Sequence, residues 1–300
     1  MTPMDSLDVD PFASPSPIAR IEHLFYLRRA THRFLVRHAT TLWTRVQQSG
    51  GQLAVVPPTV AALPARRQPE ALAAEEAARF THAHLYGLDE AATTAAVTLG
   101  AAMVDYTHNG VAPGAHRAWT PVATPPARTG LLRWASGIGY DSVGIPLIAC
   151  HWGPIPQGIW LAWWPDHRLT VRNDITQFGI TRQKAKLVLE EFGPLGYPEV
   201  ATTLTLRPDA DPDTALNAHS DTDTPAELQE DAYLLALTST VLASWALLTT
   251  PGAAHLIKRR PTAAQATRDR RAGLQPRPAT LVTEPINTAV IERLGNEGEP

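Results

Sequence analysis

Residues 130–168 read GLLRWASGIGYDSVGIPLIACHWGPIPQGIWLAWWPDHR. This stretch holds five of the eight tryptophans of the chain and its single cysteine, Cys150, but only four formal charges. Short apolar and aromatic runs alternate with glycine and proline, which is typical of strands joined by turns. The predicted strands cover residues 130–135, 145–152 and 158–164. Both faces of the third strand are apolar, so we expect layers on both sides of the sheet.

The connections between these strands are short, and parallel strands need crossovers of a dozen or more residues. The pattern therefore favours an antiparallel meander, continued by strands at Leu169–Arg172 and Ala201–Arg207. Helical patterns lie on both sides of this region in the sequence. The prediction is an α+β protein with an antiparallel sheet of four to six strands and helices before and after it.

Composition divides the chain into regions. The helical region is expected to form one compact unit with the β-rich region, which ends in a helix. The acidic, Pro- and Ser-rich start of the chain is expected to be disordered. The predicted regions are a tail at 1–17, a helical region at 18–115, a β-rich region at 116–294 and a tail at 295–300.

Three helices are predicted in detail. The Ala-rich run 70–102 should be divided at Gly87, with Asp89 or a neighbour capping the second part. Residues Thr181–Phe192 form a short amphipathic helix; a strand rather than a second helix follows it, which argues against a helix-turn-helix and for packing on the sheet. The uncharged run Ala232–Thr250 is nearly long enough to span a bilayer, but its six Ser and Thr residues favour a buried central helix.

Net charge and cysteine content limit the class of protein. The net charge of −3 shows that the 300-residue chain as a whole is not a polycation. One cysteine forbids an internal disulfide and is compatible with a reducing compartment. The acidic N-terminus does not have the pattern of a signal peptide. We expect a cytoplasmic protein with no membrane association.

Two local segments are nevertheless strongly basic. The helical pattern 18–48 carries six arginines against Glu22 alone, and residues 258–277 carry seven basic residues against Asp269. Such segments suit contact with the phosphate backbone of nucleic acid. The alternatives are a solvated or internally paired face for the first segment and a flexible tether for the second. The residues predicted to contact phosphate are Arg28, Arg29, Arg33, Arg37, Lys258, Arg259, Arg260, Arg270 and Arg271.

The tryptophan-rich stretch permits a different function. Trp134, Trp152 and Trp160 could stack a planar or sugar-like ligand, with His151 and Asp141 as the polar groups of an enzyme or small-molecule pocket. The alternative is that these tryptophans pack in the core, which the apolar flanking positions favour.

No catalytic residue, metal site or cofactor is predicted. Cys150 and His151 are adjacent on a strand, so their side chains point to opposite faces and do not make a nucleophile–base pair. The glycines at 137 and 139 lack the third glycine and the following helix of a dinucleotide loop. The acidic run beginning at Asp209 lacks the glycine and the final glutamate of a calcium loop.

The Ala-rich helix and four short motifs that follow it carry a resemblance to known proteins. The four motifs are GLLxW at 130–134, GIG at 137–139, WGP at 152–154, and the apolar helix around Trp245 with its Arg-rich extension. From about residue 76 onward the chain resembles a set of uncharacterised actinobacterial proteins associated with plasmids and phages. The resemblance implies a mobile-element or regulatory role and brings no catalytic residues. The expected function is non-enzymatic binding of nucleic acid or a protein partner.

Overall fold

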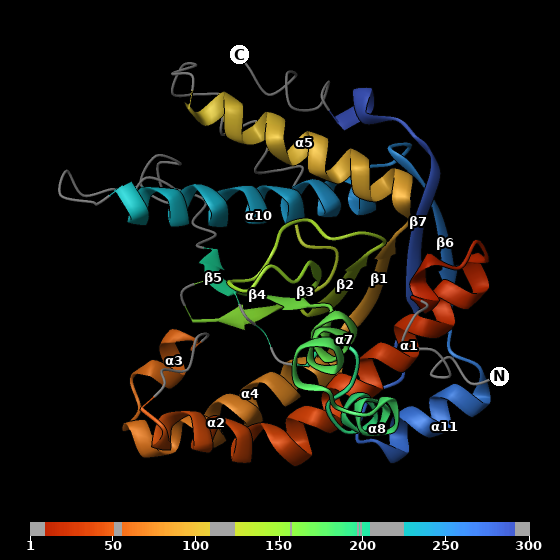
Figure 1. Ribbon diagram of the computed structural model, residues 1–300. Helices are drawn as coiled ribbons and strands as arrows, with labels where there is room; N and C mark the ends of the chain where they lie inside the picture. Colours follow the sequence, from red (N-terminus) through yellow and green to blue (C-terminus); the bar gives the residue numbers. More distant parts are fainter. Residues whose placement is uncertain are drawn as a thin grey trace.

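The computed structural model describes residues 10–50, 56–108, 124–156, 158–196, 198, 200–204 and 225–291. Its centre is one seven-stranded sheet in the order β5-β4-β3-β2-β1-β7-β6 (Figure 1). The strands are β1 (His84–Leu88), β2 (Gly130–Trp134), β3 (Leu147–Ile155), β4 (Gly158–Pro165), β5 (Val200–Leu204), β6 (Ala254–Arg259) and β7 (Ala279–Ile286).

The sheet is mixed. Strand β1 is parallel to both β2 and β7, whereas the other neighbouring pairs are antiparallel. The expected α+β class is confirmed, but the prediction of a purely antiparallel sheet with at most six strands is wrong. Strand β1 was missed because its HLYGL sequence lies inside an Ala-rich run that was predicted to be helical. Since β1 lies between two strands of the predicted β-rich region, the predicted helical and β-rich regions share one sheet.

Helices cover both faces of the sheet, as the two apolar faces of β4 require. Helices α5 and α10 lie on one face; α1, α2 and α4 lie on the other (Figure 1). The bounds of the main covering helices are α1 (Pro17–Phe34), η2 (Leu35–Ala39), α2 (Thr40–Gln48), α4 (Gln68–His82), α5 (Glu90–His108) and α10 (Pro225–Thr249). Short turns at η1 (Pro11–Ala13), α3 (Pro58–Ala61) and η3 (Ala65–Arg67) complete the amino-terminal half.

The tryptophans in the described part of the chain pack in the core, which was the predicted alternative to a ligand pocket. Trp134, Trp152, Trp163 and Trp245 are fully buried in the layer between the sheet and α10. Trp164 is fully buried in the other layer. The core therefore has two halves, one on each side of the sheet.

Helix α10 packs closely on α5. A Cβ atom on Gly100 would lie 2.8 Å from the backbone nitrogen of Thr240, so only glycine allows this approach. The window Ala232–Thr249 has a mean hydropathy of 1.6 and is the one candidate membrane span in the described residues. Since 61% of it is buried inside the protein, it is placed as a core helix.

The first described residues are ordered, although 1–17 was predicted to be a disordered tail. Asp10 caps η1 by accepting a 2.9 Å hydrogen bond from the Phe12 backbone N–H. Phe12 is fully buried and fills the space above Gly87, where a Cβ atom would lie 2.7 Å from its ring. Burial of the apolar Phe12 ring explains why this end of the predicted tail is ordered. Residues 1–9 and the predicted tail at 295–300 lie outside the described residues.

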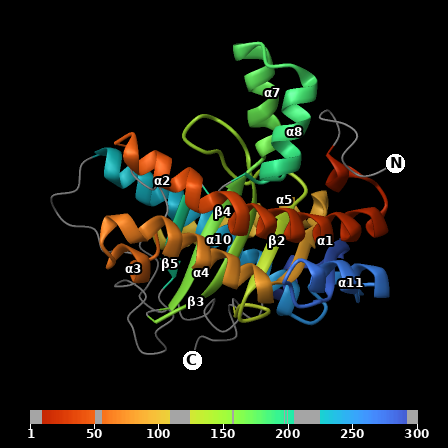
Figure 2. The ribbon, with the colours of Figure 1, turned by 90° about the horizontal axis from the view of Figure 1, so that it is seen from below.

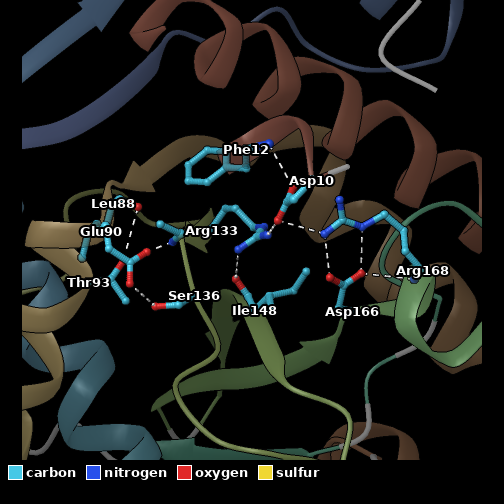
Figure 3. A network of polar contacts seen from close by, with 11 residues as sticks. Asp10, Phe12, Leu88, Glu90, Thr93, Arg133, Ser136, Ile148, Asp166 and Arg168 are labelled. Atoms are coloured by element: carbon cyan, nitrogen blue, oxygen red, sulfur yellow. Dashed lines mark hydrogen bonds and ion pairs between the residues drawn. The ribbon is translucent and has the colours of Figure 1, made fainter. Parts of the chain in front are cut away.

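Charged groups also hold this amino-terminal turn (Figure 3). Asp10 lies between two guanidinium groups, at 2.5 Å from Arg133 and 2.8 Å from Arg168. Arg168 also forms a two-pronged ion pair with Asp166. Although burial opposes ionisation, Arg133 and Arg168 hold the pKa of Asp10 well below its ordinary value. Charges of both signs balance inside this network, so we assign it a structural role.

Residues 166–199 differ from the prediction. The expected strand Leu169–Arg172 belongs to a helix, α7 (His167–Phe178), and α8 (Arg182–Phe192) follows it after a three-residue turn. The amphipathic helix Thr181–Phe192 is confirmed, with Thr181 as its N-cap. As predicted, a strand (β5) follows α8. Helix α8 was expected to pack on the sheet, but it packs on α7, which precedes it, and on α1.

The basic segment 258–277 is not a tether. Its first residues finish β6, and α11 (Ala263–Arg271) follows. A capping box starts α11: Thr262 accepts from the backbone of Gln265, and the Gln265 side chain accepts from the backbone of Thr262. This reciprocal pair satisfies N–H groups at the helix start that would otherwise lack partners. The prolines around the segment bound the helix instead of unfolding it.

Candidate nucleic-acid interface

Helix α1 carries arginines on two sides. Ser16 caps it and Pro17 opens it, and its apolar stripe packs on the sheet. Arg28 points inward and is fully buried. Arg29 is partly exposed, and Arg33 is fully on the surface. The helical period thus separates a structural arginine from surface arginines.

Asp269 of α11 joins the two basic segments of the sequence. Its buried carboxylate lies 2.6 Å from Arg28 and 2.9 Å from Arg29. Arg28 also donates a 3.0 Å hydrogen bond to the carbonyl of Ala83. One carboxylate thereby faces two guanidinium groups. Helix α11 is fixed on α1, and a positive charge is left over at their junction.

A groove lies between α1–η2 and α11, and we call it the arginine groove. It has a volume of about 510 Å³. Its described lining contains five arginines and no acidic residue. The lining residues are Tyr26, Arg29, Ala30, His32, Arg33, Val36, Arg37, Arg268, Arg271 and Ala272. Arg29 already pairs with Asp269, and Arg33 donates to the carbonyl of Glu190. The concentration of guanidinium groups is nevertheless suited to a polyanion, because a guanidinium group can donate two parallel hydrogen bonds to a phosphate.

A turn of π-helix shapes one wall of the groove. The residues of η2, Leu35–Ala39, form the wider turn between α1 and α2. This turn carries the exposed side chains of Val36 and Arg37 into the groove lining. Single π-turns within helices occur frequently at functional sites. The π-turn therefore supports the groove as a site.

Two neutral groups complete the groove. Burial raises the pKa of Tyr26 to about 12, so its hydroxyl keeps its proton at physiological pH. Burial and the nearby charge of Arg28 lower the pKa of His32 from its ordinary value of 6.5. The groove therefore offers fixed guanidinium charges, and its cationic character does not depend on a histidine proton.

The structure brings together four of the nine residues predicted to contact phosphate. Arg29, Arg33, Arg37 and Arg271 line the arginine groove. Arg268 joins them; its charge was counted in the basic segment, but it was not selected. The sequence did not predict α11. It therefore could not show which residues of this helix line the groove, such as Arg268 and Arg271, and which are buried, such as Asp269.

The other five lie elsewhere. Arg28 is buried in the Asp269 pair, so its proposed phosphate contact is wrong. Arg270 is exposed on α11 outside the groove lining. Lys258 and Arg259 lie on β6, which is one of the two edge strands of the sheet, and Arg260 follows it. These three therefore do not form one site with the groove.

A second basic cavity lies where β1, β2 and β7 begin. It has a volume of about 590 Å³ and its described lining carries three arginines and two histidines against one glutamate. Arg79 is already engaged by Glu75 and Glu76 at 2.8 Å each. Burial and the charge of Arg277 lower the pKa of His84. The cavity adds positive potential on the α4 side of the molecule.

The proposed aromatic pocket is not formed. Trp134 and Trp152 belong to the α10 side of the sheet, whereas Trp160 and His151 contact Glu76 of α4 on the other side. A sheet thus separates residues that were expected to share a ligand. Asp141 lies apart, in a turn where it accepts hydrogen bonds from nearby backbone N–H groups.

His151 and Glu76 form a buried polar cluster instead. The Glu76 carboxylate contacts His151 Nε2 and accepts hydrogen bonds from Arg79 and from the Trp160 indole. The Trp164 indole, which can only donate, gives a 2.8 Å hydrogen bond to His151 Nδ1. This bond fixes the tautomer that has its proton on Nε2. Although burial opposes ionisation, these contacts lower the pKa of Glu76.

This cluster has no nucleophile. As predicted, Cys150 points to the opposite face from His151, and burial raises the pKa of its thiol. Among the described residues no group of three or more His, Cys, Asp or Glu side chains could hold a metal ion. The arrangement explains how the polar groups between α4 and the sheet are satisfied.

Comparison of this chain with family models, with curated proteins and with solved structures gives no match.

Proposed function

We propose that this chain binds nucleic acid through its phosphate backbone, in the arginine groove. The observation that carries the proposal is the juxtaposition of two basic segments more than two hundred residues apart. They come together in one groove that has no acidic residue in its described lining. In a chain with a net charge of −3, such a concentration of arginine points to a local function.

The chemistry of the groove supports a backbone contact. Guanidinium groups bind phosphate oxygens irrespective of the base sequence, and they release counterions when they do so. We further propose that the protein is a non-enzymatic accessory or regulatory protein of a mobile element, acting in the cytoplasm.

The test is fluorescence anisotropy with labelled DNA and RNA over a series of salt concentrations. The variant replaces Arg33, Arg37 and Arg271 by glutamine. Since each phosphate contact contributes about one unit to the salt dependence of the logarithm of the association constant, we expect the slope to fall by up to about three. Affinity at low salt should fall by about tenfold or more for every sequence tested.

The matched control replaces Arg45, Arg66 and Arg67 by glutamine. These three are also exposed but lie outside the groove lining. The control removes the same charge and should bind nearly as the unaltered chain does. Equal losses in the two variants would reject the groove as the site, and the absence of salt-dependent binding would reject the function.

A further inference from the structure

Three parallel strands begin beside one another at the second basic cavity. His84 opens β1, which is parallel to β2 on one side and to β7 on the other. Because the amino ends of parallel strands meet at one edge of a sheet, the segments that enter β2 and β7 converge beside the start of β1. Arg128 lies just before β2 and Arg277 lies just before β7. The topology therefore brings two arginines that are far apart in the sequence to the two sides of His84, and all three line the cavity.

Helix α4 forms another wall of the cavity, and this wall is rigid. Arg79 of α4 is buried, and Glu75 and Glu76 each hold its guanidinium group at 2.8 Å. The stem of Arg79 lies against β3 at Gly153, where a Cβ atom would come within 2.9 Å of it. A wall that is fixed before a ligand arrives lowers the entropic cost of binding.

The charges of the cavity are not balanced. Glu75 is the one acidic residue in its described lining, and it pairs with Arg79. This lining therefore offers no carboxylate to Arg128 or Arg277. The Arg277 side chain donates a 2.9 Å hydrogen bond to Gln275, but its Nε atom is buried and has no hydrogen-bond partner in the described part of the chain. A buried polar group without a partner is uncommon and calls for an explanation, such as a bound ion.

The pKa of His84 reflects the excess of positive charge. Burial lowers this pKa, and the charges of Arg277 and Arg28 lower it further. His84 is therefore neutral at physiological pH and keeps one N–H donor. Thr129, which follows Arg128, adds a hydroxyl group to the lining. An anion in the cavity would meet two guanidinium groups and two neutral donors.

The second basic cavity is separate from the arginine groove. The described linings of the two have no residue in common. Helices α4 and α11 lie on the same face of the molecule (Figure 2), and the backbone N–H of Gln275 donates a 3.1 Å hydrogen bond to the carbonyl of Thr81 at their junction. The volume of about 590 Å³ falls in the range of small-molecule sites, roughly 300–1,000 Å³.

We propose that the second basic cavity binds a phosphate monoester of a small molecule, held by Arg128 and Arg277. The imidazole of His84 and the hydroxyl of Thr129 complete the set of donors. A phosphate monoester carries a charge of about −2 at pH 7, which matches the two guanidinium groups that have no carboxylate. Each guanidinium group can donate two parallel hydrogen bonds to the phosphate oxygens. This site does not depend on the proposed function and adds a small-molecule ligand to it.

Isothermal titration calorimetry of the full chain at low salt tests the site. The probes are inorganic phosphate and AMP, and adenosine is the unphosphorylated counterpart. We expect both probes to bind and adenosine not to bind. The variant with Arg128 and Arg277 replaced by glutamine should bind AMP about tenfold more weakly, or worse. Because Arg277 is half-buried, Arg128→Gln alone, at an exposed position, repeats the test with less risk to the fold.

A variant with the opposite effect separates loss of the site from loss of the fold. Glu75→Gln removes the one negative charge of the described lining, whereas Glu76 still holds Arg79. It should bind AMP more tightly than the unaltered chain. The matched control replaces Arg66 and Arg67, which are exposed and lie outside the lining, by glutamine. This control should bind AMP as the unaltered chain does.

Three results would overturn the proposal. They are the absence of binding of both probes, equal weakening in the control and in the Arg128 and Arg277 variant, and binding of the dicarboxylate succinate as tightly as AMP. A fourth concerns the source of the phosphate. If AMP does not bind, but a DNA strand with a terminal phosphate binds more tightly than the same strand without it, the cavity holds a strand end and the small-molecule ligand is wrong.

The groove variant distinguishes this site from the proposed function. With Arg33, Arg37 and Arg271 replaced by glutamine, the chain should lose nucleic-acid affinity and keep its affinity for AMP. Binding of AMP without binding of any nucleic acid would reject the proposed function alone. Binding of nucleic acid without binding of either probe would reject the phosphate site alone.

Discussion

His23 is buried on α1 with few polar partners. It packs between Phe12 and Tyr26, at centroid distances of 6.1 and 5.9 Å. Burial, with a further contribution from the charge of Arg133, lowers its pKa from 6.5 to about 3. The Asp10 carboxylate raises this pKa, but burial is the larger effect. His23 is therefore neutral in the folded protein at any pH above the value at which carboxylates titrate.

This shift predicts a pH dependence of stability. Between pH 6.5 and about 3 the unfolded chain binds a proton at His23 that the folded chain does not bind. The free energy of unfolding should consequently fall as the pH falls through this window, by at most about 1.4 kcal/mol per pH unit from this residue. Replacement of His23 by phenylalanine keeps the ring and removes the proton site, so we expect a flatter profile.

Urea unfolding at several pH values between 4 and 7 measures this difference. His82→Gln, at an exposed position, controls for the loss of a histidine. Parallel profiles for His23→Phe and the unaltered chain would contradict the assignment. Because His32, His84 and His167 also have lowered pKa values, some acid sensitivity should remain.

At the level of helices and strands, the contact between α5 and α10 is the most sensitive to substitution. Replacement of glycine by alanine ordinarily favours a helix by about 1 kcal/mol. At Gly100, however, the new Cβ atom would lie 2.8 Å from the backbone of Thr240, which cannot rotate away. We expect Gly100→Ala to destabilise the protein by about 1–3 kcal/mol, measured by thermal or urea unfolding.

The control is Ala101→Gly, on the exposed side of the same helix. It should cost only the difference in helix propensity, about 1 kcal/mol. The prediction is contradicted if Gly100→Ala has a higher free energy of unfolding than the unaltered chain. Helices α5 and α10 could then move apart to accept the new methyl group without energetic cost.

The local sequence predicts those helices and strands whose hydrophobic period and end signals lie within the element itself. The strands around the tryptophans, the helix at Thr181–Phe192 and the buried helix at Ala232–Thr250 all have a clear period or clear end signals. The predicted cap at Asp89 is also found, where the carboxylate accepts from the backbone of Ala92. Each of these depends on neighbours within a few residues.

The missed elements depend on distant partners. Strand β1 is five residues long and its direction is set by β2 and β7. Helix α7 has a mixed sequence and is stabilised by packing on α8. Helix α11 has a polar sequence and is fixed by the Asp269 pairs with α1. For the same reason, four residues of the arginine groove could be predicted as basic, but not as neighbours.

At the scale of the whole molecule, the tryptophans that lie in the described residues are all buried. Trp43, with 6% of its surface exposed, is the most exposed of the seven that lie in the described residues. Native fluorescence should therefore be blue-shifted and resist quenching by iodide. Unfolding in urea should raise the quenching constant several-fold, because iodide reaches exposed rings only.

Trp119 lies outside the described residues, so the variant Trp119→Phe isolates the seven core tryptophans. Its native emission should show almost no iodide quenching. If quenching of this variant equalled that of the unfolded chain, the two-layered tryptophan core would be wrong.

The position of β7 between β1 and β6 has a consequence for synthesis on the ribosome. Until residues 254–286 have emerged, β1 has no neighbour on one side, and Arg28 has no carboxylate from Asp269. An uncovered strand edge is a template for pairing with other chains. The nascent chain therefore carries an uncovered β1 edge until β7 has been translated, and the seven-stranded order is complete only when β7 joins β1. We expect the β1 edge to be open to pairing with other chains until β7 has emerged.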